Sequence, residues 1–213
     1  MGLGAGVRLT AAAVPVGPVA RPTVVGVLLA AGAGTRMGRP KALVRDPSGT
    51  PWVVLGVDAL LDGGCDEVVV VLGAAAEAAR ELVPARPDVR IVVAPDWADG
   101  PGASLAAGLR ALPDGTAACI SLVDLPGLPA EVVRRVLAGP WTEGVLRRAV
   151  HAGHPGHPVL VGPGHRARLL AAVLREPGDR SAGAWLRGAG VEAVPCDDLW
   201  DGADQDRPGS DVP

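Results

Sequence analysis

Residues 24–43 read VVGVLLAAGAGTRMGRPKAL, an apolar run that leads directly into a loop with three glycines and three basic side chains. Residues 24–30 are mostly aliphatic and lack polar alternation, which predicts a strand buried on both faces. The loop therefore lies at the carboxyl end of a buried strand, where open α/β sheets bind their ligands. Lys41 is the single lysine of the chain among twenty basic residues. Its place beside this loop suggests a specific role.

The rest of the chain alternates short apolar runs with amphipathic segments, the pattern of a parallel sheet covered by helices on both faces. We expect a three-layer α/β/α sandwich with a mostly parallel, Rossmann-like sheet. The pattern becomes looser after residue 141. The predicted strands are 24–30, 67–73, 89–94, 116–124, 144–150, 157–162 and 191–196, and the predicted helices are 52–64, 74–83, 103–112, 129–139, 164–176 and 182–190.

Length and composition limit the classes of protein. The 213 residues suit one domain over 24–200, preceded by a disordered leader (1–23) and followed by a flexible acidic tail (201–213). A net charge of −3 without a basic run disfavours nucleic acid as a partner. No apolar run reaches the roughly 18 residues of a membrane span, so we expect no membrane partner. Three widely spaced cysteines fit a reducing cytoplasm better than a disulfide framework or zinc site.

The loop after the first strand has the features of an anion site. Gly32 and Gly34 allow a tight turn that brings backbone amides against a ligand, and Arg36 and Lys41 add positive charge. The glycine spacing fits neither a Walker A loop nor a dinucleotide fingerprint. Pro40 keeps the chain extended before the lysine. These features predict a phosphate ligand; the alternative is a solvated lysine on a glycine-rich turn.

The pattern L-A-A-G-x-G-x-R-M-G-x-P-K-x-L, present without a gap from Leu29 to Leu43, resembles the signature of the MobA-like nucleotidyltransferases. More narrowly, it is similar to that of the molybdenum cofactor cytidylyltransferases. The resemblance implies a glycosyltransferase-A-like fold, a loop that wraps a nucleoside triphosphate, and CTP as the nucleotide, since Ala31 is typical of the cytidylyl branch. The nucleotide-binding residues implied are Leu29, Ala30, Ala31, Gly32, Gly34, Arg36, Met37, Gly38, Lys41, Gly100 and Ser104.

Asp124 follows the predicted strand 116–124 in LVDLPGL and is a candidate ligand of Mg²⁺, which prefers carboxylate and phosphate oxygens. A helix N-cap is the alternative, but Pro126 and Pro129 separate Asp124 from the next helix. In the family that the loop resembles, the aspartate of a D-x-P after this strand binds the metal. The tail 204–211 is similar to that family's D-V-D-T-P-x-D, so Asp206 is a second candidate metal ligand; a solvated acidic tail is the alternative.

The segment 96–109, DWADGPGASLAAGL, resembles the family's W-x-x-G-x-x-x-S-L-x-x-G-L. Gly100 loosens the loop, and Ser104 is expected to start a helix whose amides favour anions. The resemblance places this serine near the nucleotide. A plain helix cap is the structural alternative, and the two roles are compatible. A nucleophilic serine is disfavoured because the final glycine of an elbow and a His–Asp partner are missing.

The histidines of HAGHPGHPVL, at 151, 154 and 157, are spaced three apart, but Pro155 and Pro158 forbid the helix that would gather them around zinc. The family has G-x-P-G-H-P-V-L here, which implies an acceptor contact for His157. The segment 176–186 is similar to G-D-x-G-A-R-x-L-L, but Gly183 stands where arginine is expected. The acceptor-binding residues implied are Gly156, His157, Pro158 and Asp179.

Together the residues and the resemblance predict an enzyme that transfers CMP from CTP to a phosphorylated small molecule, such as the molybdenum cofactor, with Mg²⁺ as cofactor and pyrophosphate as product. Its catalytic residues would be Arg36, Lys41 and Asp124. Two alternatives remain. One is a dinucleotide-dependent oxidoreductase, which the glycine spacing disfavours. The other is a non-catalytic nucleotide-binding partner or insertion factor for a molybdoenzyme.

Overall fold

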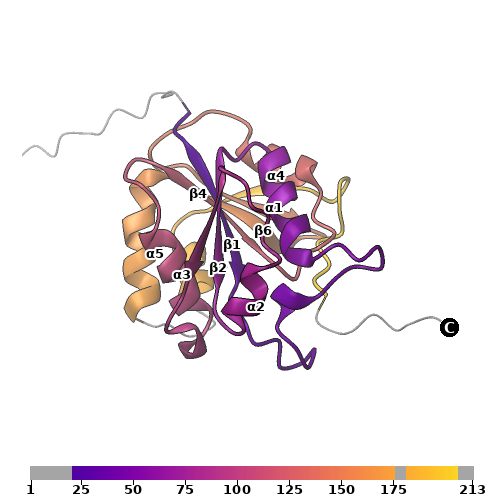
Figure 1. Cartoon of the computed structure of the whole chain (residues 1–213). Helices are drawn as coiled ribbons and strands as arrows, with labels where there is room; N and C mark the ends of the chain where they lie inside the picture. Colours follow the sequence, from indigo (N-terminus) through magenta and orange to yellow (C-terminus); the bar gives the residue numbers. More distant parts are fainter. Residues whose placement is uncertain (1–20, 176–180, 206–213) are drawn as a thin grey trace, which may run out of the picture.

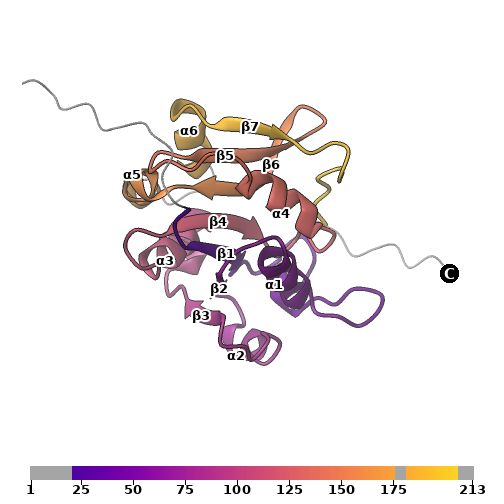
Figure 2. The same ribbon diagram turned by 90° about the horizontal axis from the view of Figure 1, so that it is seen from above.

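The computed structural model describes residues 21–175 and 181–205. Within these residues the strands form one seven-stranded sheet in the order β3-β2-β1-β4-β6-β5-β7. Helices cover both faces of the sheet, as Figures 1 and 2 show. The strands are β1 (Val24–Ala30), β2 (Glu67–Leu72), β3 (Val89–Val93), β4 (Ala117–Leu122), β5 (Leu146–His151), β6 (His154–Val161) and β7 (Glu192–Pro195).

The sheet is mostly parallel, as the sequence predicts. β1 lies in its centre and pairs in parallel with both β2 and β4. β6 runs against its two neighbours, β4 and β5, and is the one antiparallel strand among those described. The carboxyl ends of β1, β2 and β4 therefore meet at one edge, which is the edge where ligands bind in such sheets.

The helices form the outer two layers. Figure 2 shows α1 and α4 on one face and α3, α5 and α6 on the other. Each face of the sheet has its own hydrophobic core, and alternate residues of β1 pack into one or the other. Leu28 packs on the α1 side, and Val27 packs on the α3 side. The helices are α1 (Trp52–Asp62), α2 (Ala76–Arg80), α3 (Pro101–Arg110), α4 (Ala130–Leu137), α5 (Pro163–Arg175) and α6 (Ser181–Gly188), with short 3₁₀ helices η1 (Lys41–Leu43) and η2 (Trp97–Asp99).

Close approach of helix and sheet depends on glycine at the α3 side. A Cβ atom on Gly108 would lie 2.8 Å from Cγ1 of Val27 and 2.9 Å from Cγ2 of Val71. Both partners are fully buried, so neither can move aside without a cost in packing. The small residue therefore lets α3 lie directly on β1 and β2, which fixes the position of the loop that precedes α3.

Several predicted boundaries differ from the structure by one or more residues, and for three of these elements the structure gives a local reason. The predicted helix 74–83 is reduced to α2, because Ala75 has left-handed backbone (φ 54°) and the chain turns again after Arg80. The predicted helix 103–112 begins earlier, at Pro101, a residue whose fixed φ suits a first helical position. β6 begins at His154 because Ala152 and Gly153, both with positive φ, make a two-residue hairpin turn to β5.

The chain continues past β7 as an irregular segment, residues 196–205, which we call the C-terminal strap. It passes from the end of β5 to the ligand edge of the sheet, where the amide of Gln205 donates to the backbone carbonyl of Asp124 at 3.0 Å. Trp200 is half-buried beside His151. None of the described helices is long and apolar enough to cross a bilayer.

Candidate active site

The loop that follows β1, residues 31–40, presents backbone amides to an open space. The amides of residues 32–35 make no hydrogen bond to any other described residue. Gly34 has φ 61°, and a Cβ there would lie 1.9 Å from the carbonyl oxygen of Arg39, so only glycine fits. A Cβ on Gly32 would instead meet no atom within 4 Å. Consecutive amides of this kind favour an anionic ligand.

Lys41 and Asp124 lie together at this edge, as the sequence predicts. Pro40 is extended (φ −56°, ψ 128°) and directs the chain into η1, whose first residue is Lys41. Lys41 Nζ donates to Asp124 Oδ2 at 2.7 Å, although the two residues are 83 positions apart. Their side chains are 15% and 19% exposed. This pair of opposite charges is thus partly shielded from water and faces the loop amides.

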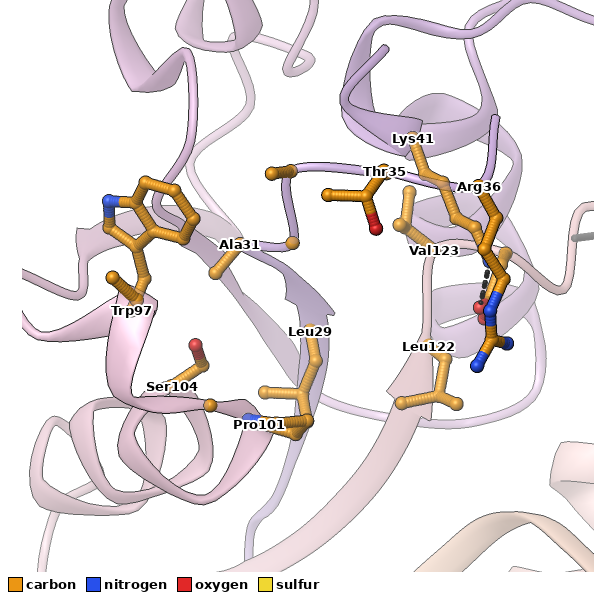
Figure 3. A pocket seen from close by; sticks show the side chains of 16 residues that line it. Leu29, Ala31, Thr35, Arg36, Lys41, Trp97, Pro101, Ser104, Leu122 and Val123 are labelled. Atoms are coloured by element: carbon orange, nitrogen blue, oxygen red, sulfur yellow. Dashed lines mark hydrogen bonds and ion pairs between the residues drawn. The ribbon is translucent and has the colours of Figure 1, made fainter. Parts of the chain in front are cut away.

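A cavity of about 440 Å³ lies between the loop, the Lys41–Asp124 pair and α3. Figure 3 shows Trp97 and Ser104 on one side of it and Arg36 and Lys41 on the other. Its volume is within the range of roughly 300–1,000 Å³ for small-molecule sites. The lining residues are Leu29, Ala31, Gly32, Ala33, Gly34, Thr35, Arg36, Lys41, Trp97, Ala98, Gly100, Pro101, Ser104, Leu122, Val123 and Asp124.

Most of the predicted nucleotide-binding residues line this cavity, and three do not. Ala30 and Met37 are buried in the α1-side core, where they support the loop from below. Gly38 is exposed outside the cavity. Ser104 does not start a helix as expected: it is the fourth residue of α3, 5% exposed, so its hydroxyl is positioned by the helix rather than capping it.

The carboxylate of Asp124 has the properties of a metal ligand. Its Oδ1 atom is buried without a hydrogen-bond partner in the described chain, whereas Oδ2 accepts from Lys41. A buried carboxylate oxygen without a partner is costly unless a ligand satisfies it. Among the described residues no three His, Cys, Asp or Glu side chains form a cluster that could hold a metal alone. A cation here would therefore need phosphate oxygens as further ligands. The second predicted metal ligand, Asp206, lies outside the described residues.

A second cavity, of about 260 Å³, adjoins the first and shares Leu29, Pro101 and Leu122 with it. His157 lines this second cavity, and its contact with an acceptor stays a prediction. Burial and the nearby Arg148 and His151 lower the pKa of His157 to about 4, so its ring is neutral near pH 7. The other lining residues are Gly102, Leu105, Ile120, Arg148, Val159, Leu169, Ala182, Gly183 and Leu186.

The other residues predicted on the acceptor side have different positions. Gly156 and Pro158 do not line the cavity, but the Gly156 carbonyl accepts from Arg148 Nε at 2.8 Å. Asp179 lies outside the described residues. His151 is 4% exposed, and its Nδ1 donates to the Trp200 carbonyl at 3.0 Å. His151 therefore contacts the C-terminal strap, whereas His154 is exposed. The two histidines do not belong to a metal-binding cluster among the described residues.

Sequence reasoning missed several residues of the site. Thr35, Pro101 and Leu122 line a cavity but carry no pattern that distinguishes them from other loop and strand residues. Arg148 stands in the pair Arg147–Arg148 on β5. Strand alternation predicts opposite faces for this pair. The sequence does not show which of the two faces the cavity.

A mostly parallel α/β sheet, with an amide-lined loop and a Lys–Asp pair at its ligand edge, defines a nucleotidyltransferase type of domain. The model of the MobA-like NTP transferase domain family matches residues 26–194. The chain belongs to this family.

The chain is similar to proteins whose names give different activities. Nicotine blue oxidoreductase of Paenarthrobacter nicotinovorans is 37% identical over 196 residues, covering 87% of this chain and 93% of that protein. Molybdenum cofactor guanylyltransferase of Burkholderia lata is 36% identical over 174 residues, covering 78% of this chain and 82% of that protein.

Among solved structures, Rv0371c of Mycobacterium tuberculosis has a TM-score of 0.72 at 26% identity, covering 88% of this chain and 95% of that one. A complex of Rv0371c with manganese has a TM-score of 0.64 at 29% identity, covering 82% and 89%. These similarities agree with the fold class that the sequence predicts.

Proposed function

We propose that this protein transfers a nucleoside monophosphate from a nucleoside triphosphate to a small acceptor molecule. An anionic or hydroxyl oxygen of the acceptor forms a bond to the α-phosphorus, the bond from the α-phosphorus to the bridging oxygen breaks, and pyrophosphate leaves. The observation that carries the proposal is the Lys41–Asp124 pair, 2.7 Å apart and next to four amides that have no partner among the described residues. Such a site neutralises a triphosphate and positions it for attack.

The residues have separate tasks in this reaction. The amides of residues 32–35 hold phosphate oxygens, and the Lys41 ammonium follows the negative charge as it moves to the leaving pyrophosphate. Arg36 lines the same cavity and adds a second positive charge. An acceptor that already carries an ionised phosphate needs no general base, since its oxygen is anionic before the attack.

Asp124 would hold a divalent cation, with Mg²⁺ as the physiological candidate. The Oδ1 atom, unpartnered within the described chain, fits this assignment, and the manganese complex of a structural relative supports it. When bound, the cation supplies positive charge to the phosphate oxygens. The part of this chain is to keep one carboxylate oxygen available while Lys41 occupies the other.

CTP is the nucleotide that we favour, because Ala31 lines the cavity where the guanylyl branch of the family usually has glycine. GTP is the competing nucleotide, since two relatives are named as molybdenum cofactor guanylyltransferases. The molybdenum cofactor is accordingly the first acceptor to test. A cytoplasmic location, which the cysteine spacing predicts, and a molybdoenzyme partner stay predictions.

The test measures pyrophosphate release by the purified chain with CTP or GTP, Mg²⁺ and molybdopterin or another phosphorylated acceptor. We expect release that depends on nucleotide, metal and acceptor together, and that Asp124→Asn abolishes. Release equal to that of a no-acceptor control for every acceptor, despite tight nucleotide binding, would favour the non-catalytic insertion factor.

An oxidoreductase is a second candidate, because the similarity to nicotine blue oxidoreductase extends over 87% of this chain. The glycine spacing of the loop fits no dinucleotide fingerprint. Titration with NADH and NADPH separates the two functions: a nucleotidyltransferase binds CTP or GTP with Mg²⁺ and neither dinucleotide, whereas the oxidoreductase gives the reverse result.

A further inference from the structure

The second cavity is lined almost entirely by apolar residues. Eleven of the thirteen residues that line it are Leu, Ile, Val, Ala, Pro or Gly, and the two polar ones are Arg148 and His157. Its floor is formed by β4 and β6, and its walls by α3, α5 and α6, which lie on one face of the sheet (Figure 2). Its volume of about 260 Å³ is slightly below the usual lower limit of roughly 300 Å³ for ligand pockets. Such a cavity suits a body of one or two rings.

Arg148 brings a positive charge to this cavity, and no described carboxylate neutralises it. Its Nε donates to the Gly156 carbonyl at 2.8 Å and one terminal nitrogen donates weakly to the Pro155 carbonyl at 3.4 Å. Its other terminal nitrogen, Nη1, has no hydrogen-bond partner within the described residues, and no acidic side chain there forms an ion pair with this arginine. Burial, and after it the positive charge of the neighbouring Arg187, lower the pKa of Arg148.

The two carbonyl contacts fix the direction of the guanidinium group. A guanidinium binds planar anions through paired donors, and two of its donors are already used to orient it. Its neighbour Arg147 differs: it is 4% exposed, and its Nε atom donates to the Glu192 carboxylate on β7 at 3.0 Å. Arg147 therefore links β5 to β7. Within the described chain Arg148 is thus held in one orientation, but no carboxylate balances its positive charge. A ligand with one anionic group would balance that charge.

His157 limits the charge that the cavity can hold. Its ring is neutral near pH 7, because burial and Arg148 oppose protonation. It therefore contributes one hydrogen-bond donor and one acceptor, and it does not add a second positive charge. A ligand with several negative charges would place all but one of them against apolar walls, which is costly.

We propose that the second cavity binds the acceptor and selects a flat, largely apolar body of one or two rings that carries, apart from the oxygen that attacks the α-phosphorus, one anionic group, held by Arg148. His157 forms one hydrogen bond to that body. This inference rests on the proposed nucleotidyl transfer, because Leu29, Pro101 and Leu122 line both cavities and so bring the two ligands into contact. A pterin has a ring edge with many hydrogen-bonding groups, and the two polar side chains of this cavity cannot pair with all of them. The inference thus disfavours molybdopterin as the preferred acceptor.

The test uses two probes that differ only in charge, 2-naphthoate and 2-naphthamide, titrated by calorimetry into the full-length protein without nucleotide. A hydrogen bond to a charged group contributes enough for naphthoate to bind roughly 10- to 100-fold more tightly than the neutral amide. Arg148→Met should reduce this preference to less than about threefold, and Arg148→Lys should keep part of it. Arg168→Met is the matched control, since Arg168 is exposed on α5, does not line the cavity and removes the same charge.

A second variant tests the cavity itself. Gly183 lines it, and a Cβ on Gly183 would have one neighbour, Arg187 Nη1, at an ordinary 3.6 Å. A Cβ atom is therefore tolerated at this position of α6, and we expect the larger side chain of Gly183→Leu to enter the cavity and weaken binding of both probes by a similar factor. Urea unfolding of each variant establishes that it is folded.

Three results would overturn the inference: equal affinity of the two probes for the wild type, no binding of either, or an equal loss in Arg168→Met and Arg148→Met. Failure of the proposed function is distinguishable. If no acceptor supports pyrophosphate release but the naphthoate preference still depends on Arg148, the anion site stands and nucleotidyl transfer fails. If transfer occurs and naphthoate does not bind, only the inference fails.

Discussion

Replacing Lys41 by methionine is the sharpest test of the nucleotide site. The side chain becomes one atom shorter and loses the ammonium group, which has three donors, one of them directed at Asp124 Oδ2 at 2.7 Å. A hydrogen bond to a charged phosphate contributes about 1.5–3 kcal/mol. We therefore expect CTP with excess Mg²⁺ to bind roughly 10- to 100-fold more weakly by calorimetry. The same titrations with GTP show whether the effect belongs to the phosphates, in which case both nucleotides lose equally.

Arg39→Met is the matched control for this prediction. Arg39 belongs to the same loop, is exposed and does not line the cavity, so its loss should change affinity by less than about threefold. Stability provides a second measurement. The Lys41 and Asp124 side chains are 15% and 19% exposed, between a surface pair and a buried pair. Lys41→Met should thus lower the free energy of unfolding by about 1–3 kcal/mol. Equal weakening of nucleotide binding in the two variants would refute the phosphate role of Lys41.

The remaining predictions concern the carboxylate, the loop and the histidine. In Asp124→Asn we expect Mn²⁺ to improve CTP binding less than about threefold by calorimetry, against at least about tenfold in the wild type, because one oxygen that is unpartnered in the described chain is no longer anionic. Gly34→Ala should lower the urea midpoint sharply, since its methyl group would lie 1.9 Å from the Arg39 carbonyl oxygen. Gly32→Ala should keep the midpoint and weaken CTP binding, because its methyl group would enter the cavity. The pKa of His157 falls from 6.5 unfolded to about 4 folded. The unfolded chain therefore binds more protons between these values, and stability is lost as the pH falls below about 6.5. Unfolding at pH 7 and pH 5 should show about 2 kcal/mol of this loss, which His157→Gln removes.

The position of the loop and of Lys41 at the ligand edge was predictable because the information for it is local. The strand 24–30 and the loop to Leu43 form one continuous segment, and the glycine spacing and Pro40 act within that segment. Asp124 could be placed opposite Lys41 because both follow strands that are neighbours in the sheet, β1 and β4. The order of parallel strands thus converts a separation of 83 positions into a contact.

The boundaries that failed depend on interactions outside their own segment. Residue 74 belongs to the predicted helix 74–83, but its amide donates to the Ala31 carbonyl, which ties it to the nucleotide loop and delays the helix. The C-terminal strap is similar, since Trp200 and Gln205 are positioned by His151 and by the Asp124 carbonyl. Neither contact has a periodic pattern, so neither can be derived from hydrophobic spacing.

The lining of the second cavity was less predictable, because it depends on which face of the sheet each residue occupies. Arg147 and Arg148 are chemically identical neighbours, yet one is a buried strut paired with Glu192 and the other faces a cavity. Alternation along β5 places them on opposite faces of the sheet, but only the packing of α4 on one face and of α6 on the other decides which arginine lies on which face.

Relatives of this chain have names that indicate different activities. Relatives at 37% and 36% identity have an oxidoreductase and a guanylyltransferase name, so similarity at this level does not determine the reaction. Under the proposed function, the loop, Lys41 and Asp124 bind the triphosphate, whereas Arg148, His157 and the apolar walls bind the acceptor. The two cavities share Leu29, Pro101 and Leu122 and are otherwise lined by different residues. Comparing CTP binding with naphthoate binding in one set of variants therefore separates the reaction that the protein performs from the molecule on which it acts.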